Sequence, residues 1–221
     1  MMKSPKSKVQ SPKSAAPKDS APLLVLISAP SGGGKTTLCQ QLLDARPDLT
    51  RVITCTTRQP RPGEKNGVDY HFLSKADFQR RVQAGDFLEH AMVFGRGYGT
   101  LKSEVFSRLR GDRDVLLNVD VQGAATVREL ARREPELKRA LVTVFLTPAS
   151  VIELEKRLKN RGADAPGEIK KRLGIARQEV AHWRNFDYLL ISSTIPNDLR
   201  RMLAIIEVEK LRAARATAPG F

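Results

Sequence analysis

The sequence predicts a three-layer α/β fold with a parallel central sheet. Four short, strongly apolar runs are each followed by a segment of helical character. Strands that are apolar throughout are buried on both faces, which is typical of parallel sheets covered by helices. The four runs that we interpret as strands are residues 23–28, 115–120, 140–146 and 186–191.

The first 22 residues differ in composition from the rest of the chain. They hold five lysines, four prolines, one acidic residue and no aromatic residue, and contribute +4 to a net charge of +14. Such a segment buries too little apolar surface to offset its chain entropy, so we expect it to be disordered. Two cysteines without an export signal, and no apolar stretch of membrane-spanning length, predict a cytoplasmic protein.

A glycine-rich loop joins the first predicted strand to a helical segment over residues 37–43. The loop, Ala29-Pro-Ser-Gly-Gly-Gly-Lys-Thr36, matches the Walker A motif with alanine at the first glycine position, so residue 29 must avoid a positive φ. Its backbone N–H groups can point at phosphate oxygens, at the positive end of the helix dipole. Lys35 can reach the β- and γ-phosphates, and the Thr36 hydroxyl suits Mg²⁺. The predicted ATP-binding residues are Ala29, Pro30, Ser31, Gly32, Gly33, Gly34, Lys35, Thr36 and Thr37.

An acidic residue ends the apolar run over residues 115–120. Asp120 is followed by Gln122-Gly123 and by a predicted helix over residues 124–133. An acid at the carboxyl end of a parallel strand lies at the crevice where such sheets bind ligands. Asp120 would there organise Mg²⁺ or substrate, or alternatively cap the helix.

The stretch between these two strands carries residues that suit a phosphorylated substrate. Arg58 and Arg61 are three apart in a loop stiffened by two prolines, and a planar guanidinium bonds two phosphate oxygens at once. Tyr70 follows, then a predicted helix over residues 75–84, and then Glu89 in an apolar, strand-like run. A carboxylate in such a setting needs a hydrogen-bonding partner.

Together these patterns resemble those of guanylate kinases. The order T-T-R-x-P-R-x-G-E, D-Y, F-L-E-x-A, Y-G-T and V-D-x-Q-G is similar to that family's GMP domain in sequence and spacing, and the resemblance covers residues 22–212. It implies a P-loop kinase fold with an inserted GMP-binding subdomain and a mobile helical lid. It also implies that the GMP phosphate is held by Arg58, Arg61, Tyr70 and Tyr98, and that the guanine is surrounded by Thr54, Glu89, Thr100 and Asp120.

The chemistry of guanine agrees with this implication. Guanine presents N1–H and N2–H₂ as adjacent donors, which the Glu89 carboxylate can accept as a pair. Adenine has an acceptor at N1 and would leave that carboxylate desolvated and unpaired. Thr54 can donate a hydrogen bond to guanine O6, which further distinguishes guanine from adenine. The alternative for Glu89 is a surface salt bridge.

The segment after the third predicted strand resembles the family's lid over ATP. A predicted helix over residues 150–159 is joined by a polar, glycine-containing loop to a second short helix. Arg161 and Arg172 match the lid arginines that face phosphate, where they would neutralise charge during transfer. For Arg157 we expect a solvated helix face.

Two departures from the family pattern bear on the Mg²⁺ and adenine sites. Asn118 stands two residues before Asp120, where the family usually has an acid that helps to organise Mg²⁺. Residues 192–198 read Ser-Ser-Thr-Ile-Pro-Asn-Asp where the family has V-N-D near the adenine, and the closing helix is predicted over residues 197–212. The adenine contacts are therefore not carried over.

We therefore predict an ATP:GMP phosphotransferase that makes ADP and GDP with Mg²⁺. Positioning and charge neutralisation carry such a reaction, and the predicted catalytic residues are Lys35, Arg58, Arg161 and Arg172. The predicted divisions are a tail (1–22), the core (23–52, 101–150 and 173–221), a GMP-binding subdomain (53–100) and a lid (151–172). The expected partners are ATP and GMP, with the chain as a monomer or homodimer and without a specific nucleic acid or a membrane.

Three alternatives stay open at this point. A non-catalytic module of the same family would bind phosphorylated peptides, but it would need neither the intact glycine loop nor the lid arginines. A kinase for another monophosphate or a phosphorylated sugar would not need Glu89 and Thr54. Nucleic-acid binding rests on the basic tail alone, and without aromatic residues such binding would be non-specific.

Overall fold

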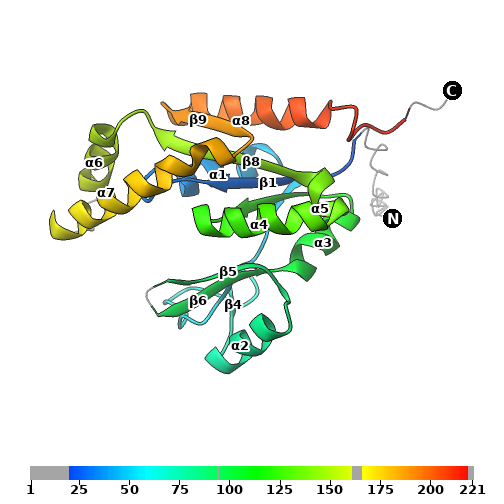
Figure 1. The fold of residues 1–221 in the computed structure, drawn as a ribbon, viewed down its shortest axis with the longest axis horizontal. Coiled ribbons are helices and arrows are strands. Elements are labelled where there is room, and N and C mark those ends of the chain that lie inside the picture. The colour runs from blue at the N-terminus through cyan, green and yellow to red at the C-terminus, as the bar shows by residue number, and fades with distance from the viewer. Residues whose placement is uncertain (1–19, 94, 161–165, 219–221) are drawn as a thin grey trace, which may run out of the picture.

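The chain folds into a three-layer α/β structure with a central sheet between two layers of helices, as the sequence predicts (Figure 1). The computed structural model describes residues 20–93, 95–160 and 166–218. The strands are β1 (Leu24–Ser28), β2 (Leu49–Arg51), β3 (Cys55–Thr56), β4 (His71–Phe72), β5 (Phe87–Val93), β6 (Arg96–Leu101), β7 (Asp114–Asn118), β8 (Leu141–Pro148) and β9 (Tyr188–Ser192). The helices are α1 (Lys35–Ala45), α2 (Lys75–Gln83), α3 (Lys102–Arg110), α4 (Val121–Arg133), α5 (Pro135–Ala140), α6 (Val151–Asn160), α7 (Pro166–Val180), the 3-10 helix η1 (Ala181–Asn185) and α8 (Ile195–Lys210).

The larger sheet has five parallel strands in the order β2-β7-β1-β8-β9. Its central strand, β1, pairs with β7 on one side and with β8 on the other. The chain leaves β1 through α1 on one face of the sheet and leaves β7 through α4 on the other face. Connections that diverge in this way open a crevice at the carboxyl ends of the strands, where such sheets bind ligands.

Alternate residues of the central strands pack against different helix layers. Val25 and Ile27 of β1 belong to a buried cluster with α1 and α8. Leu24 and Leu26 belong to a second cluster, with α3, α4 and α5. The strands β1, β7 and β8 are buried along nearly their whole length, which confirms their interpretation as strands of a parallel sheet covered on both faces. The edge strand β9 is not covered in this way, because Leu189 and Ile191 are exposed.

Two smaller units project from these layers. A four-stranded sheet in the order β4-β3-β6-β5 lies below the core in Figure 1 with α2, where the rings of Phe78 and Phe87 pack 4.7 Å apart. The helices α6 and α7 lie at the left of the figure and share an apolar cluster that includes Leu158 and Ile169. The smaller sheet lies in the segment expected to form the GMP-binding subdomain. The helices α6 and α7 begin in the segment expected to form the lid, but α7 is longer than the short helix expected and continues to Val180, beyond residue 172.

Some local features have no counterpart in the sequence predictions. The strand β2 and the helix α5 are too short to show a hydrophobic period. Residues 20–22, which we grouped with the tail, lie against the C-terminal segment, where Ser20 pairs with Ala216. The rest of the predicted tail, residues 1–19, lies outside the described residues. Within the described ranges, no helix combines the length and apolarity that crossing a membrane requires.

A buried polar cluster fixes the end of α8 to the sheet. Glu209 is 2% exposed, accepts a hydrogen bond from Tyr188 Oη at 2.5 Å, and forms an ion pair with Arg215. Arg215 also donates to the carbonyl oxygens of Arg139 and Leu141, at 2.8 and 3.0 Å. Removing the charge of Glu209 would therefore leave the buried Arg215 guanidinium without its ion-pair partner.

We expect Glu209→Gln to lower the free energy of unfolding by about 3 kcal/mol for this reason. Urea denaturation followed by circular dichroism measures the change. The control is Glu207→Gln, an exposed site on the same helix, which should shift the free energy of unfolding by less than about 0.5 kcal/mol. Equal denaturation midpoints for the two variants would contradict the prediction.

Candidate active site

A cleft of about 340 Å³ opens at the carboxyl end of the central sheet. The start of α1 and the end of β7 form one wall, and β5 and β6 form the opposite wall. Asn118, at the departure from the family pattern, also lines this cleft. The structure thus brings together several predicted site residues, namely Thr36, Thr54, Tyr70, Glu89, Tyr98 and Asp120.

The glycine loop has the backbone conformation that a phosphate cradle requires. Gly32 and Gly34 have φ values of +89° and +96°, which residues with a side chain rarely adopt. Ala29 is not among the described residues with a positive φ, so the expectation for alanine at this position is confirmed. The Gly33 N–H donates to Pro30 O at 2.8 Å and closes the loop just before α1.

Lys35 is half-buried between the glycine loop and the end of β7. Its ammonium group donates to Val119 O at 2.7 Å. Burial lowers the pKa of Lys35, whereas nearby carboxylates, including those of Asp120 and Glu179, act to raise it. The only lysine of the loop thus lies next to the crevice, as the motif predicts.

Glu179 lies beside the same loop and is not predicted from the sequence. Its Oε2 accepts the Ser31 N–H at 3.4 Å. Burial raises the pKa of Glu179, while the Ser31 hydrogen bond and the charge of Lys35 lower it. The two partners are 148 positions apart in the chain, so no local pattern in the sequence could have identified this contact.

Glu89 is a buried carboxylate on the opposite wall of the cleft. It is 7% exposed, and its Oε1 accepts a hydrogen bond from the Thr100 hydroxyl at 2.7 Å. Burial raises the pKa of Glu89, although the hydrogen bond from Thr100 acts in the other direction. Its partner is therefore a hydroxyl group inside the protein and not the surface cation that the salt-bridge alternative requires.

Asp120 caps the helix that follows it. Its Oδ1 accepts the Gly123 N–H at 2.8 Å, and Asp120 is the N-terminal cap of α4. The capping alternative is thereby confirmed. Asp120 also lines the cleft, and a carboxylate has a second oxygen, so the capping role leaves room for a contact with a ligand.

Arg58 is buried and oriented by Glu64. Its terminal nitrogens donate to the two Glu64 oxygens at 2.9 and 2.8 Å, and its guanidinium lies 5.2 Å from the centre of the Tyr70 ring. The hydrogen bonds with Glu64 raise the pKa of Arg58, which keeps it charged. Tyr70 in turn meets Tyr98 edge to face, with ring centres 6.4 Å apart. Glu64 belongs to the quoted motif, but its orienting role becomes visible only in three dimensions.

None of the predicted arginines that the structure describes, Arg58 included, is among the residues that line the cleft. Arg61 is exposed, and its backbone N–H donates to Glu64 Oε2 at 2.7 Å. Arg172 is half-buried on α7. Arg161 lies outside the described residues.

A second cavity, of about 380 Å³, extends from the glycine loop to the start of α8. Thr37 lines it, as do Ser192 and Asp198 from the segment that departs from the family pattern. Arg157 also lines it: its side chain is 25% exposed, pairs with Glu153 and donates to Ser192 Oγ. The expectation of a solvated helix face for Arg157 is therefore wrong, because the end of β9 packs against that face of α6.

The comparisons with known proteins agree with this geometry. A model of the family "Guanylate kinase" matches residues 21–209. The chain is 40% identical over 193 residues to a guanylate kinase of Maricaulis maris, covering 87% of this chain and 86% of that protein. It is 42% identical over 189 residues to one of Coxiella burnetii, covering 86% and 88%.

A solved structure extends the likeness to three dimensions. The crystal structure of guanylate kinase from Anaplasma phagocytophilum superposes with a TM-score of 0.70 at 29% sequence identity, over 89% of this chain and 90% of that one. The family match spans both the glycine loop and the smaller sheet with its buried glutamate. The chain belongs to the guanylate kinase family.

Proposed function

We propose that this chain transfers the γ-phosphoryl group of ATP to GMP and releases ADP and GDP. One observation carries this proposal: the buried Glu89 carboxylate, bonded to Thr100, lies across the cleft from the start of the phosphate-loop helix. A group suited to a guanine base and a loop suited to phosphates thus face one another. Relatives that are guanylate kinases support the same activity.

Guanine recognition is assigned to the wall formed by β5 and β6. The Glu89 carboxylate accepts N1–H and N2–H₂ of the base, and its bond from Thr100 fixes the orientation of the acceptor oxygens. Thr54, also in the lining, donates to O6. Adenine would place its N1, a hydrogen-bond acceptor, opposite the buried carboxylate, which is also an acceptor. AMP should therefore be a poor substrate.

The phosphate of GMP is assigned to the aromatic side of the cleft. Tyr70 and Tyr98 line it, and Arg58 stacks on Tyr70 with its charge held by Glu64. Arg61 would reach the same phosphate from the exposed loop. Because these groups are oriented by protein contacts, little reorganisation is needed when substrate binds.

Phosphoryl transfer is assigned to charge neutralisation by basic side chains. The glycine loop binds the ATP phosphates, and Lys35 reaches the β- and γ-phosphates from the floor of the site. Arg172 and Arg161, from the proposed lid, would approach the transferred group on closure. The reaction needs no covalent intermediate with the protein, because the GMP phosphate oxygen attacks the γ-phosphorus in line.

The polar oxygens at the end of β7 and the start of α1 fit a magnesium ion. Thr36, Asn118 and Asp120 offer a hydroxyl, an amide and a carboxylate oxygen, the kind of ligands that Mg²⁺ prefers. This small set suits an ion that keeps several waters and binds mainly through substrate phosphates. When bound, Mg²⁺ would neutralise charge on the β- and γ-phosphate oxygens.

Gly123 brings the start of α4 close to the guanine-binding group. A Cβ at this position would lie 3.0 Å from Glu89 Oε2 and 3.1 Å from Val119 Cβ. We therefore expect Gly123→Ala to displace the Glu89 carboxylate slightly and to raise the KM for GMP about 10-fold. Steady-state kinetics measure this, with the KM for ATP as internal control. A KM for GMP equal to that of the unmodified protein would contradict it.

The domain divisions, cellular location and oligomeric state follow as parts of the proposal. We assign GMP binding to residues 53–100 and the lid to residues 151–172. A cytoplasmic location suits Cys39 and Cys55, which are unpaired and buried, with burial raising the pKa of both thiols to about 11. One chain supplies the lining of both cavities, so a monomer would suffice and a homodimer would carry two sites.

The test of this function is ADP release from ATP with different acceptors. GMP should support turnover, whereas AMP, dTMP or no acceptor should support little. Chelation of divalent cations should stop the reaction and added Mg²⁺ should restore it. Equal rates with all acceptors, or none above background with GMP, would overturn the assignment.

A further inference from the structure

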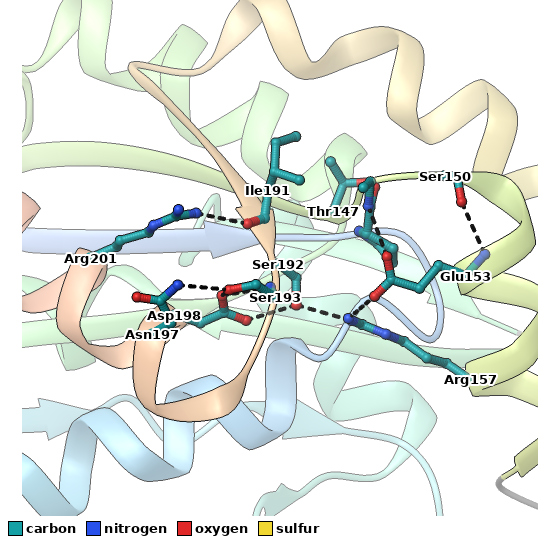
Figure 2. Close-up of polar contacts among 12 residues, drawn as sticks. Thr147, Ser150, Glu153, Arg157, Ile191, Ser192, Ser193, Asn197, Asp198 and Arg201 are labelled. Carbon is teal, nitrogen blue, oxygen red and sulfur yellow. Dashed lines mark hydrogen bonds and ion pairs between the residues drawn. The ribbon is translucent and has the colours of Figure 1, made fainter.

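A chain of hydrogen bonds joins the helix α6 to the core beside the phosphate loop (Figure 2). Arg157 Nη1 donates to Ser192 Oγ at 3.0 Å, and Ser192 Oγ donates to Asp198 Oδ2 at 2.7 Å. Asp198 Oδ1 accepts the Ser193 N–H at 2.9 Å. Arg157, Ser192 and Asp198, which we call the Arg157 relay, all line the second cavity.

The direction of each hydrogen bond in the Arg157 relay follows from the groups involved. A carboxylate only accepts and a guanidinium only donates. The single hydroxyl hydrogen of Ser192 therefore goes to Asp198, and its lone pairs face Arg157. Ser192 and Asp198 are 7% and 6% exposed, so water competes little for these bonds. The carboxylate thus orients the guanidinium through one hydroxyl group.

The relay holds Arg157 at a place where an anion is expected. A Cβ on Gly34 would lie 3.7 Å from Arg157 Nη1, and Gly34 caps the start of α1. A cation beside the positive end of a helix dipole is unfavourable unless an anion binds between the cation and the helix N-terminus. The ion pair with Glu153 and the hydrogen bond to Ser192 nevertheless keep the guanidinium there.

We propose that Ser192 and Asp198 are positioning residues that hold Arg157 against the donor nucleotide and so set the affinity for ATP. The proposal rests on the proposed function, because it requires a nucleotide on the phosphate loop. Neither residue touches the reacting atoms. Both lie in residues 192–198, the segment where this chain departs from the V-N-D pattern of its family.

Steady-state kinetics of single and double variants test the relay. Ser192→Ala should raise the KM for ATP about 10-fold, the loss of one hydrogen bond to a charged group. The kcat and the KM for GMP should stay within about twofold of the values for the unmodified protein, since the proposed GMP site lies on the other side of the phosphate loop. Ser192→Thr, which keeps the hydroxyl, should restore most of the affinity for ATP.

A double variant that combines Ser192→Ala with Arg157→Ala shows whether Ser192 acts by positioning Arg157 or has a structural role of its own. In that background Ser192→Ala should have no further effect on the KM for ATP, because the two side chains act as one unit. Asp198→Asn keeps an acceptor for the Ser193 N–H but loses the charge, and it should raise the KM for ATP as well. The matched control is Arg201→Ala, whose side chain donates to Ile191 O at 3.1 Å outside the relay.

The possible outcomes distinguish the relay from the proposed function. Additive effects of Ser192→Ala and Arg157→Ala would overturn the relay. An unchanged KM for ATP in Ser192→Ala, with or without a lower melting temperature, would overturn it too and leave Ser192 a structural role. If the unmodified protein released no ADP in response to GMP, the proposed function would fail, and the relay with it.

Discussion

Lys35→Met is expected to lower the kcat of GMP phosphorylation by about 1,000-fold. The methionine keeps the apolar stem of the side chain but removes the charge that would contact the β- and γ-phosphates. Lys35 is half-buried at the floor of the site, where its interactions with phosphate are only partly screened by water. The KM for GMP should change little, because the guanine wall lies on the other side of the cleft.

The control for this variant is Lys138→Met, at an exposed position on α5. It removes the same charge from the surface and should leave kcat within about twofold. Thermal melting of both variants checks that they fold, since Lys35→Met also loses the hydrogen bond to Val119 O. A kcat for Lys35→Met within tenfold of the unmodified protein would show that this lysine is not part of the phosphate site.

Glu89→Gln is expected to lower kcat/KM for GMP by about 100-fold while the affinity for ATP is retained. The carboxylate would accept two guanine donors, and each hydrogen bond to a charged group contributes about 1.5 kcal/mol. An amide offers one acceptor and turns a donor toward the base. The amide also disturbs the bond from Thr100, which in the unmodified protein donates to Glu89 Oε1 at 2.7 Å.

The pH dependence of GMP binding gives a second test of the same group. Burial raises the pKa of Glu89 above its ordinary value of 4.5. Guanine binds the ionised carboxylate, so protons compete with GMP, and the affinity for GMP should fall as the pH drops through this raised pKa. In the Glu89→Gln variant this fall should be absent. The effect on stability has the opposite direction. Because ionisation of a buried carboxyl is unfavourable, the free energy of unfolding falls as the pH rises through this range.

Glu129→Gln is the matched control for both experiments. Glu129 is exposed on α4, where it pairs with Arg132, and the variant should reproduce the GMP kinetics and the pH profile of the unmodified protein. Isothermal titration with GMP reports affinity directly. If Glu89→Gln bound GMP as tightly as the control at neutral pH, the account of guanine recognition given above would be wrong.

The fold could be predicted from the sequence because its signals are local. The strands are recognisable because their apolar residues follow one another without a break, whereas helices at the surface have a polar face. The loop from Ala29 to Thr36 marks where the first strand ends and the first helix begins. The buried carboxylate was also predictable, since Glu89 stands in a strand whose other residues, apart from His90, are apolar. Such features depend only on neighbouring residues, so one sequence is enough to show them.

The remaining parts depend on contacts between distant segments. Arg157 looks like a solvated residue on α6 until the end of β9 is placed against it. Glu179 reaches Ser31 from α7. Residues 20–22 read as part of a basic tail, and only the fold supplies their partners. Polarity alone could not separate these residues from ordinary surface side chains.

The bridge between Ser20 and Ala216 brings the two ends of the described chain together beyond the amino ends of the central strands. Both cavities lie at the opposite end of the sheet, around the loop that follows β1. A short peptide joining those two residues would close only a small loop, at little entropic cost. The fold is therefore suited to circular permutation, with new termini in the exposed turn at Gly111-Asp112, and neither cavity would have to be cut.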